Sequence, residues 1–134
     1  MPFSHKRHGD LKIECVYCHP AARTGERAGF PEAARCMTCH RAVKTGSPEI
    51  RKLAALPQAT RLTPATPVYR LPDFVFFSHA RHDAARIECQ ACHGAVFGQD
   101  AVKPVLAMKM RACVDCHRSR RASVACNVCH ELNE

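Results

Sequence analysis

The chain has 134 residues, enough for one compact domain or two very small ones, and its formal net charge is +8. No stretch approaches the roughly 20 apolar residues that a membrane-spanning helix needs, and the longest, Phe74 to Phe77, is far too short. No recognition motif accompanies the basic charge, which disfavours a nucleic-acid binder. Ten cysteines in so short a chain indicate a disulfide scaffold, metal sites or haem attachment.

Two copies of one histidine unit mark the beginnings of two similar halves. The first runs from Phe3 to His8 and the second from Phe77 to His82, at a constant offset of 74 residues, the difference between positions 3 and 77. Each copy reads Phe-Ser-His-x-Arg-His and comes shortly before a cysteine motif. The repeat predicts an N-terminal two-haem half, a connector and a C-terminal three-haem half, at residues 1–46, 47–72 and 73–134.

Every cysteine lies in one of five Cys-x-x-Cys-His motifs. Residues i and i+3 lie close together on one helical turn, so both thiols reach the two vinyl groups of one porphyrin, and the next histidine projects towards the iron. This spacing is the signature of c-type haem attachment, so the sequence predicts five covalently bound haems c. The motifs are Cys15, Cys18 and His19; Cys36, Cys39 and His40; Cys89, Cys92 and His93; Cys113, Cys116 and His117; Cys126, Cys129 and His130.

Zinc and redox chemistry are the two competing interpretations of the cysteine pairs. Four-thiolate zinc sites need the pairs to match two by two, which five pairs do not allow. Neither zinc sites nor redox dithiols explain a histidine directly after every pair. The five repeats therefore favour haem strongly over both.

The four remaining histidines, His5, His8, His79 and His82, are the candidate distal iron ligands. The alternative is that they are surface histidines, and their occurrence as paired copies argues against it. Four histidines serve four of five haems, so the fifth takes a methionine, takes another group or stays open. Met110 and then Met108, just before the fourth motif, are the favoured candidates for one of the last two haems. Packing of these flexible side chains beside a haem is an alternative of nearly equal weight.

Two further helices are predicted around the connector. Residues 30–34 resemble a helix start that runs into the second motif. Ser47, Pro48 and Glu49 provide a helix cap, a first-turn proline and a first-turn acid, which predicts a short helix that continues to Leu56. Four prolines then impose an extended path that we interpret as a plain spacer: Pro57, Pro64, Pro67 and Pro72.

The expected fold is mainly α-helical with much irregular structure and little or no β-sheet. With about one haem for every 27 residues, the porphyrins form much of the interior, and the Phe that opens each histidine unit is expected to pack on one of them. The apo chain is expected not to fold, because it buries too little apolar surface to offset its conformational entropy.

The histidine units followed by Cys-x-x-Cys-His resemble the class III multihaem cytochromes c. The resemblance implies that the first histidine of a unit ligates the haem attached next and the second ligates a following haem. The implied pairs are His5 with His19, His8 with His40, His79 with His93, and His82 with His117. The fifth haem is then held by His130 with a methionine.

Residues 3–40 and 71–118 also resemble the pentahaem subunit of alternative complex III and related quinol-oxidising complexes. That similarity implies a periplasmic or extracellular electron-transfer protein that meets redox partners or a membrane quinol-oxidising complex. No signal peptide is visible before the first motif. A repeating unit of a haem filament, hence a homo-polymer, is one alternative. A multihaem reductase with one open iron is the minor enzymatic alternative.

Overall fold

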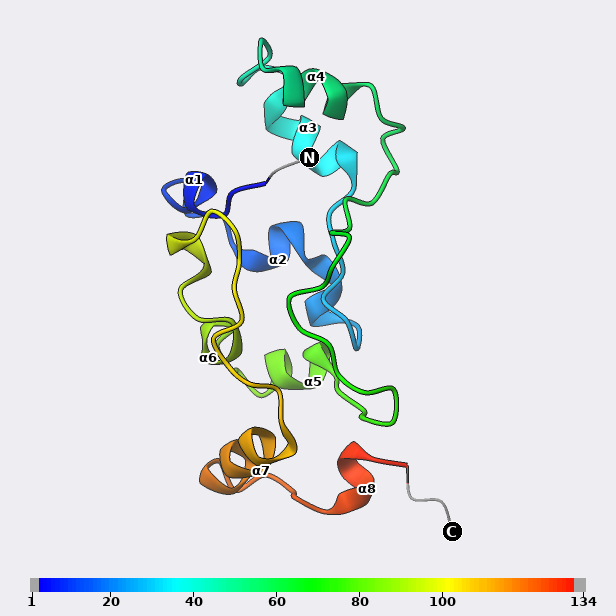
Figure 1. Ribbon diagram of the computed structural model, residues 1–134, viewed down its shortest axis with the longest axis vertical. Coiled ribbons are helices and arrows are strands. Elements are labelled where there is room, and N and C mark those ends of the chain that lie inside the picture. Colours follow the sequence, from blue (N-terminus) through cyan, green and yellow to red (C-terminus); the bar gives the residue numbers. More distant parts are fainter. Residues whose placement is uncertain (1–2, 132–134) are drawn as a thin grey trace.

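Short helices joined by long irregular segments make up the computed structural model, which describes residues 3–131 (Figure 1). The mainly helical, irregular fold class is confirmed: within this range, extended backbone pairs only as two isolated bridges, Glu32 with Arg61 and Val75 with His130. The helices are α1 Lys6–Gly9, α2 Cys15–Cys18, η1 Pro20–Arg23, α3 Ala33–His40, α4 Pro48–Ala54, α5 His79–Ala84, α6 Gln90–His93, η2 Val96–Gly98, α7 Met110–Ser119 and α8 Cys126–Cys129.

The polypeptide alone has almost no hydrophobic core. Among the described residues, only Ala33 and Leu53, where α3 packs against α4, are buried hydrophobic side chains. The chain exposes 10,525 Å², whereas a globular protein of its mass exposes about 7,000 Å². Large apolar side chains remain exposed, and Phe74 is 63% exposed. The fold therefore has room for an apolar interior that the protein does not itself supply.

Each cysteine motif forms a helical turn, as the three-residue spacing of its thiols predicts. The first and fifth motifs are single turns, α2 and α8, and the third is centred on α6. The second and fourth lie in longer helices, α3 and α7. The helix start predicted at residues 30–34 is present, with Glu32 as the cap of α3.

The two histidine units fold alike, because the serine at the second position of each accepts a backbone N–H from the helical turn that follows. The backbone N–H of Arg7 donates to the Ser4 hydroxyl at 3.2 Å, and that of Arg81 donates to Ser78 at 3.3 Å. A serine oxygen that accepts a backbone N–H of the first turn is a common helix cap. Ser78 is the N-cap of α5, and Ser4 directly precedes His5, the N-cap of α1. These serine contacts help to fix both turns and the histidines that they carry.

The connector does more than the plain spacer that the sequence suggested. Its helix α4 begins at Pro48 after the Ser47 cap as predicted, but it ends at Ala54, before Leu56. The extended segment then runs along the start of α3, where the N–H of Ala33 donates to the Thr60 carbonyl at 2.8 Å. The connector therefore supports the second motif as well as joining the two halves.

The order of the helices along the long axis of the molecule differs from their order in the sequence (Figure 1). One end holds α3 and α4, α2 follows, α5 and α6 come next, and α7 and α8 form the opposite end. The two halves contact one another reciprocally, since α1 of the first packs against η2 of the second and α5 of the second packs against η1 of the first.

Candidate haem sites

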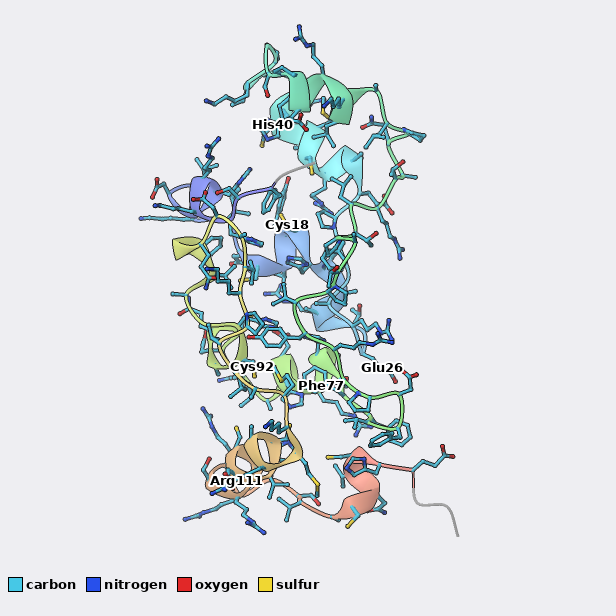
Figure 2. The ribbon with its side chains drawn as sticks, in the orientation of Figure 1. Cys18, Glu26, His40, Phe77, Cys92 and Arg111 are labelled. Atoms are coloured by element: carbon cyan, nitrogen blue, oxygen red, sulfur yellow. The ribbon has the colours of Figure 1, made fainter. Side chains whose placement is uncertain are left out.

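All ten motif thiols are unpaired and exposed or half-buried (Figure 2). No group of three or more His, Cys, Asp or Glu side chains within residues 3–131 is placed to hold a metal ion by itself. Six of the ten thiols are exposed and the other four are half-buried.

Three pairs of histidines face each other at one recurring separation. The ring centres are 6.2 Å apart for His8 and His40, 6.4 Å for His79 and His93, and 6.1 Å for His82 and His117. Two imidazoles that bind one iron through Nε2 from opposite faces have ring centres about 6 Å apart, because each Fe–N bond is about 2 Å long. The three pairs therefore fit bis-histidine ligation of iron.

The fourth implied pair is His5 and His19, whose imidazoles influence each other electrostatically. Burial lowers the pKa of His5, and the neighbouring His19 and His8 rings lower it further. The pKa of His93, which corresponds to His19 in the repeat, is lowered by burial first and then by His79 and His19. Lower pKa values favour neutral imidazole, the form that binds metals.

Backbone carbonyls orient most of the candidate ligands. A carbonyl only accepts hydrogen bonds, so each contact places the ring proton on Nδ1 and leaves the Nε2 lone pair free for iron. The seven Nδ1–carbonyl contacts, between 2.7 and 3.2 Å, are His8 to Ser4, His19 to Gly29, His40 to Val43, His79 to Glu26, His82 to Ser78, His117 to Ser123 and His130 to Phe74.

The phenylalanine of each histidine unit contacts the two histidine rings of its own unit. Phe3 lies edge-on to His5 at 4.9 Å and stacks on His8 at 4.7 Å between ring centres. Phe77 repeats both contacts, at 4.8 Å with His79 and 4.6 Å with His82. Besides the porphyrin packing that the sequence predicts for them, these two rings hold the candidate ligands in position, a role that the sequence pattern did not indicate.

Sequence reasoning also missed Tyr69, a connector residue that braces the third motif. Its hydroxyl donates to the Cys92 carbonyl at 3.0 Å and accepts the Val105 N–H at 2.9 Å. Its ring centre is 5.1 Å from that of His93. A lone tyrosine in a proline-rich segment carries no sequence signal for this role.

Replacing Tyr69 with phenylalanine is expected to destabilise the haem-loaded protein by about 1–3 kcal/mol, because the Cys92 carbonyl and the Val105 N–H both lose a hydrogen-bond partner. Chemical denaturation followed by haem absorbance measures the change. Tyr17→Phe is the matched control, since the described contact of Tyr17 is the Arg35 guanidinium 4.7 Å from its ring centre, which phenylalanine retains. Equal stability of Tyr69→Phe and the control would contradict the bracing role.

The histidine of the fifth motif lies beside a phenylalanine. The His130 ring lies against Phe74, with ring centres 5.8 Å apart, and the Cys129 carbonyl accepts the Phe76 N–H at 2.8 Å. Met110 is the first residue of α7 and is 65% exposed, while Met108 is half-buried just before it. Both thioethers thus lie at the start of the helix that carries the fourth motif.

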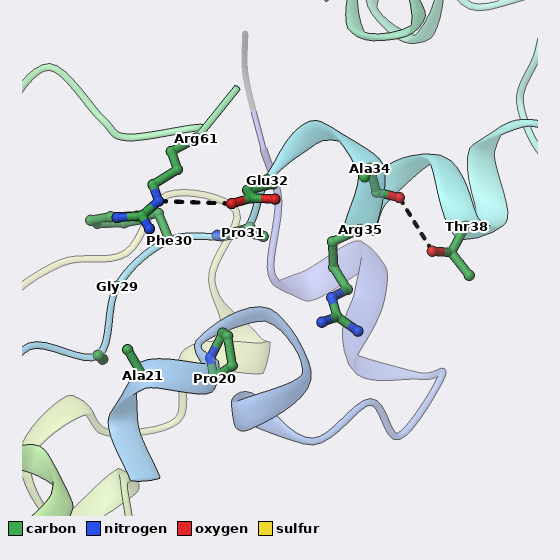
Figure 3. Close-up of a pocket in the computed structure, with 11 residues that line it drawn as sticks. Pro20, Ala21, Gly29, Phe30, Pro31, Glu32, Ala34, Arg35, Thr38 and Arg61 are labelled. Atoms are coloured by element: carbon green, nitrogen blue, oxygen red, sulfur yellow. Dashed lines mark hydrogen bonds and ion pairs between the residues drawn. The ribbon is translucent and has the colours of Figure 1, made fainter. Parts of the chain in front are cut away.

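A cavity of about 400 Å³ separates η1 from α3 (Figure 3). Phe30 lines it and also contacts His19, with ring centres 5.8 Å apart. Arg35 and the ion pair of Arg61 with Glu32, at 4.0 Å, lie on its polar side. Its lining includes Pro20, which directly follows the first motif, and Thr38, which lies within the second, so the cavity lies between these two motifs.

Comparison with known proteins agrees with this geometry. Residues 75–131 match the family model described as cytochrome c7 and related cytochrome c. The chain is 32% identical over 157 aligned positions to the multiheme cytochrome c subunit of menaquinone reductase from Nitratidesulfovibrio vulgaris (strain Hildenborough), across 96% of this chain and 75% of that protein. The chain therefore belongs to the multihaem cytochromes c, electron carriers with covalently bound haem c.

Proposed function

We propose that the chain carries five haems c, one on each Cys-x-x-Cys-His motif, and transfers electrons outside the cytoplasm for a quinol-linked respiratory complex. The observation that carries the proposal is the recurrence of facing imidazole pairs about 6 Å apart beside the motif thiols. The similarity to a menaquinone reductase subunit supports the quinol link. No helix in the described part of the chain is long and apolar enough to cross a membrane.

The motif cysteines, the motif histidines and the remaining candidate ligands would hold the haems in different ways. The ten motif cysteines would form the thioether bonds, and His19, His40, His93, His117 and His130 would supply the proximal ligands. His5, His8, His79 and His82 would supply four distal ligands, and Met110 or else Met108 would complete the site of His130. When bound, each haem supplies reversible one-electron chemistry between ferric and ferrous iron.

Ligation of all five irons suits transfer of electrons better than catalysis, because a reductase needs an iron position open to its substrate. The carbonyl contacts of the histidines support this role, since they hold the rings rigidly in one tautomer. A rigid ligand set changes little between oxidation states.

Haem counting tests the proposal directly. The protein, produced in a host that matures c-type cytochromes, is expected to give five haems per chain by pyridine haemochrome and a mass increase of five porphyrins, with no thiol left to alkylate. The reduced protein is expected to be low-spin and unchanged by carbon monoxide. Fewer than five haems would overturn the count, and carbon monoxide binding would instead indicate an open iron and the reductase alternative.

The quinol link has its own test. Membranes that contain a menaquinol-oxidising complex are expected to reduce the protein when menaquinol is added, and the reaction is expected to stop when the complex is inhibited. Sedimentation at high protein concentration separates this role from a filament, since long polymers in place of discrete particles would favour the homo-polymer alternative.

A further inference from the structure

The two halves of the repeat contact each other through equivalent positions. The Lys6 N–H donates to the Gln99 carbonyl at 3.0 Å, and the Ala80 N–H donates to the Gly25 carbonyl at 3.0 Å. Lys6 corresponds to Ala80, and Gly25 to Gln99, at the 74-residue offset of the repeat. Each half thus docks its histidine unit on the loop that follows the first motif of the other half. Such exchange is the property of an interface with two-fold symmetry.

A second pair of contacts repeats the exchange. Gly9 lies against Phe97, so closely that a β-carbon at Gly9 would sit 2.9 Å from that of Phe97. Asp83 pairs with Arg23 at 3.9 Å. Gly9 corresponds to Asp83, and Arg23 to Phe97. Different chemistry at equivalent positions shows that the symmetry belongs to the backbone arrangement and does not depend on particular side chains.

The axis of this two-fold relation passes between the first and third motifs. Cys15 and Cys89 are equivalent in the repeat and lie near each other: burial raises the pKa of Cys15, and the charge of the neighbouring Cys89 thiol raises it further. In an interface of this symmetry, a residue that lies beside its own equivalent is close to the axis. The first and third motifs therefore form the central pair of the molecule.

The second and fourth motifs flank this central pair on opposite sides. Figure 1 shows α3 and α7, the helices that carry these two motifs, towards opposite ends of the molecule. The His40 ring centre lies 6.2 Å from that of His8, and the His117 ring centre lies 6.1 Å from that of His82. His8 and His82 are equivalent in the repeat, so the second and fourth motifs are held by equivalent contacts.

The figures show the same order along the molecule. In Figure 2, His40, Cys18, Cys92 and Arg111 follow one another from one end to the other. His40, Cys18 and Cys92 belong to the second, first and third motifs in turn, and Arg111 lies on α7, the helix that carries the fourth. The fifth motif lies in α8, beside α7 (Figure 1). Burial and then the Cys129 thiol raise the pKa of Cys113, which joins the fifth motif to the fourth.

We propose that the five attachment sites form a single file in the order second, first, third, fourth, fifth. The proposal rests on the proposed function, since it assumes that all five motifs hold haem. As a consequence, the haem of the first motif lies inside the file. The haems of the second and fifth motifs, with His40 and His130 as their motif histidines, lie at its two ends. Partners that exchange electrons with the ends would then meet α3 at one end of the molecule and α8 at the other.

Locating the five irons in the haem-loaded, wild-type protein tests the order. Anomalous scattering at the iron edge in crystals, or a cryo-electron microscopy map with the porphyrins traced to their cysteines, assigns each iron to a motif. The expected result is that the iron of the first motif has two neighbours, those of the second and third motifs, and that the second has only one. Five irons in sequence order, or in a branched cluster, would overturn the proposal and leave the haem count intact, whereas fewer than five irons would refute the count itself.

Discussion

The polypeptide without attached haem is expected to remain unfolded. Replacing all ten motif cysteines with alanine prevents attachment, and we expect far-UV circular dichroism of a disordered chain and rapid proteolysis throughout. The physical reason is the missing core, since Ala33 and Leu53 are the buried hydrophobic residues among those described. Burying them contributes a few kcal/mol at most, whereas ordering the backbone costs about 1–2 kcal/mol for every residue.

A variant that loses a single haem provides the control for this experiment. Cys126→Ala with Cys129→Ala removes the attachment site in α8, at one end of the molecule, and is expected to preserve the helices of the other four motifs. Cys15→Ala with Cys18→Ala removes a central site, where the Cys89 thiol neighbours Cys15, and is expected to destabilise the chain more. Cooperative thermal unfolding of the ten-alanine variant would show that the polypeptide has a core of its own and would refute the prediction.

Much of the site chemistry could be predicted from the sequence because it resides in local patterns. The Cys-x-x-Cys-His spacing sets a helical turn whatever surrounds it, and the turns are present in α2, α3, α6, α7 and α8. The paired histidine units gave four ligand candidates by counting, and the structure brings three of them to within 6.1–6.4 Å of a motif histidine. The helical, sheet-poor fold followed from the proportion of haem to protein.

Contacts between segments distant in the sequence could not be predicted in this way. The backbone hydrogen bond from Lys6 to Gln99 helps to place the third motif beside the first, and neither residue type predicts such a contact. Tyr69 braces Cys92 from 23 residues away through one hydroxyl. The predicted end of α4 at Leu56 was wrong for a local reason, because the helix ends at Ala54. A helix end without a glycine carries a weaker sequence signal than a helix start.

Loss of the His79 imidazole is expected to open one haem. His79 lies on α5 with its ring centre 6.4 Å from that of His93, and its Nδ1 donates to the Glu26 carbonyl at 2.7 Å. Alanine at this position leaves the iron of the third motif with one axial ligand, so it is expected to become high-spin and to bind carbon monoxide after reduction. Absorbance and electron paramagnetic resonance spectra should show one such haem per chain and the remaining haems unchanged.

Matched variants separate loss of the ligand from damage to the helix. Asp83→Ala changes the same helix but removes only the exposed ion pair with Arg23 at 3.9 Å, an interaction worth less than about 1 kcal/mol, and is expected to remain fully low-spin. Added imidazole, or His79→Met, is expected to restore a sixth ligand and abolish the carbon monoxide band. A His79→Ala protein that stays low-spin and does not bind carbon monoxide would mean that another residue ligates this iron. The pairing of His79 with His93 would then be wrong.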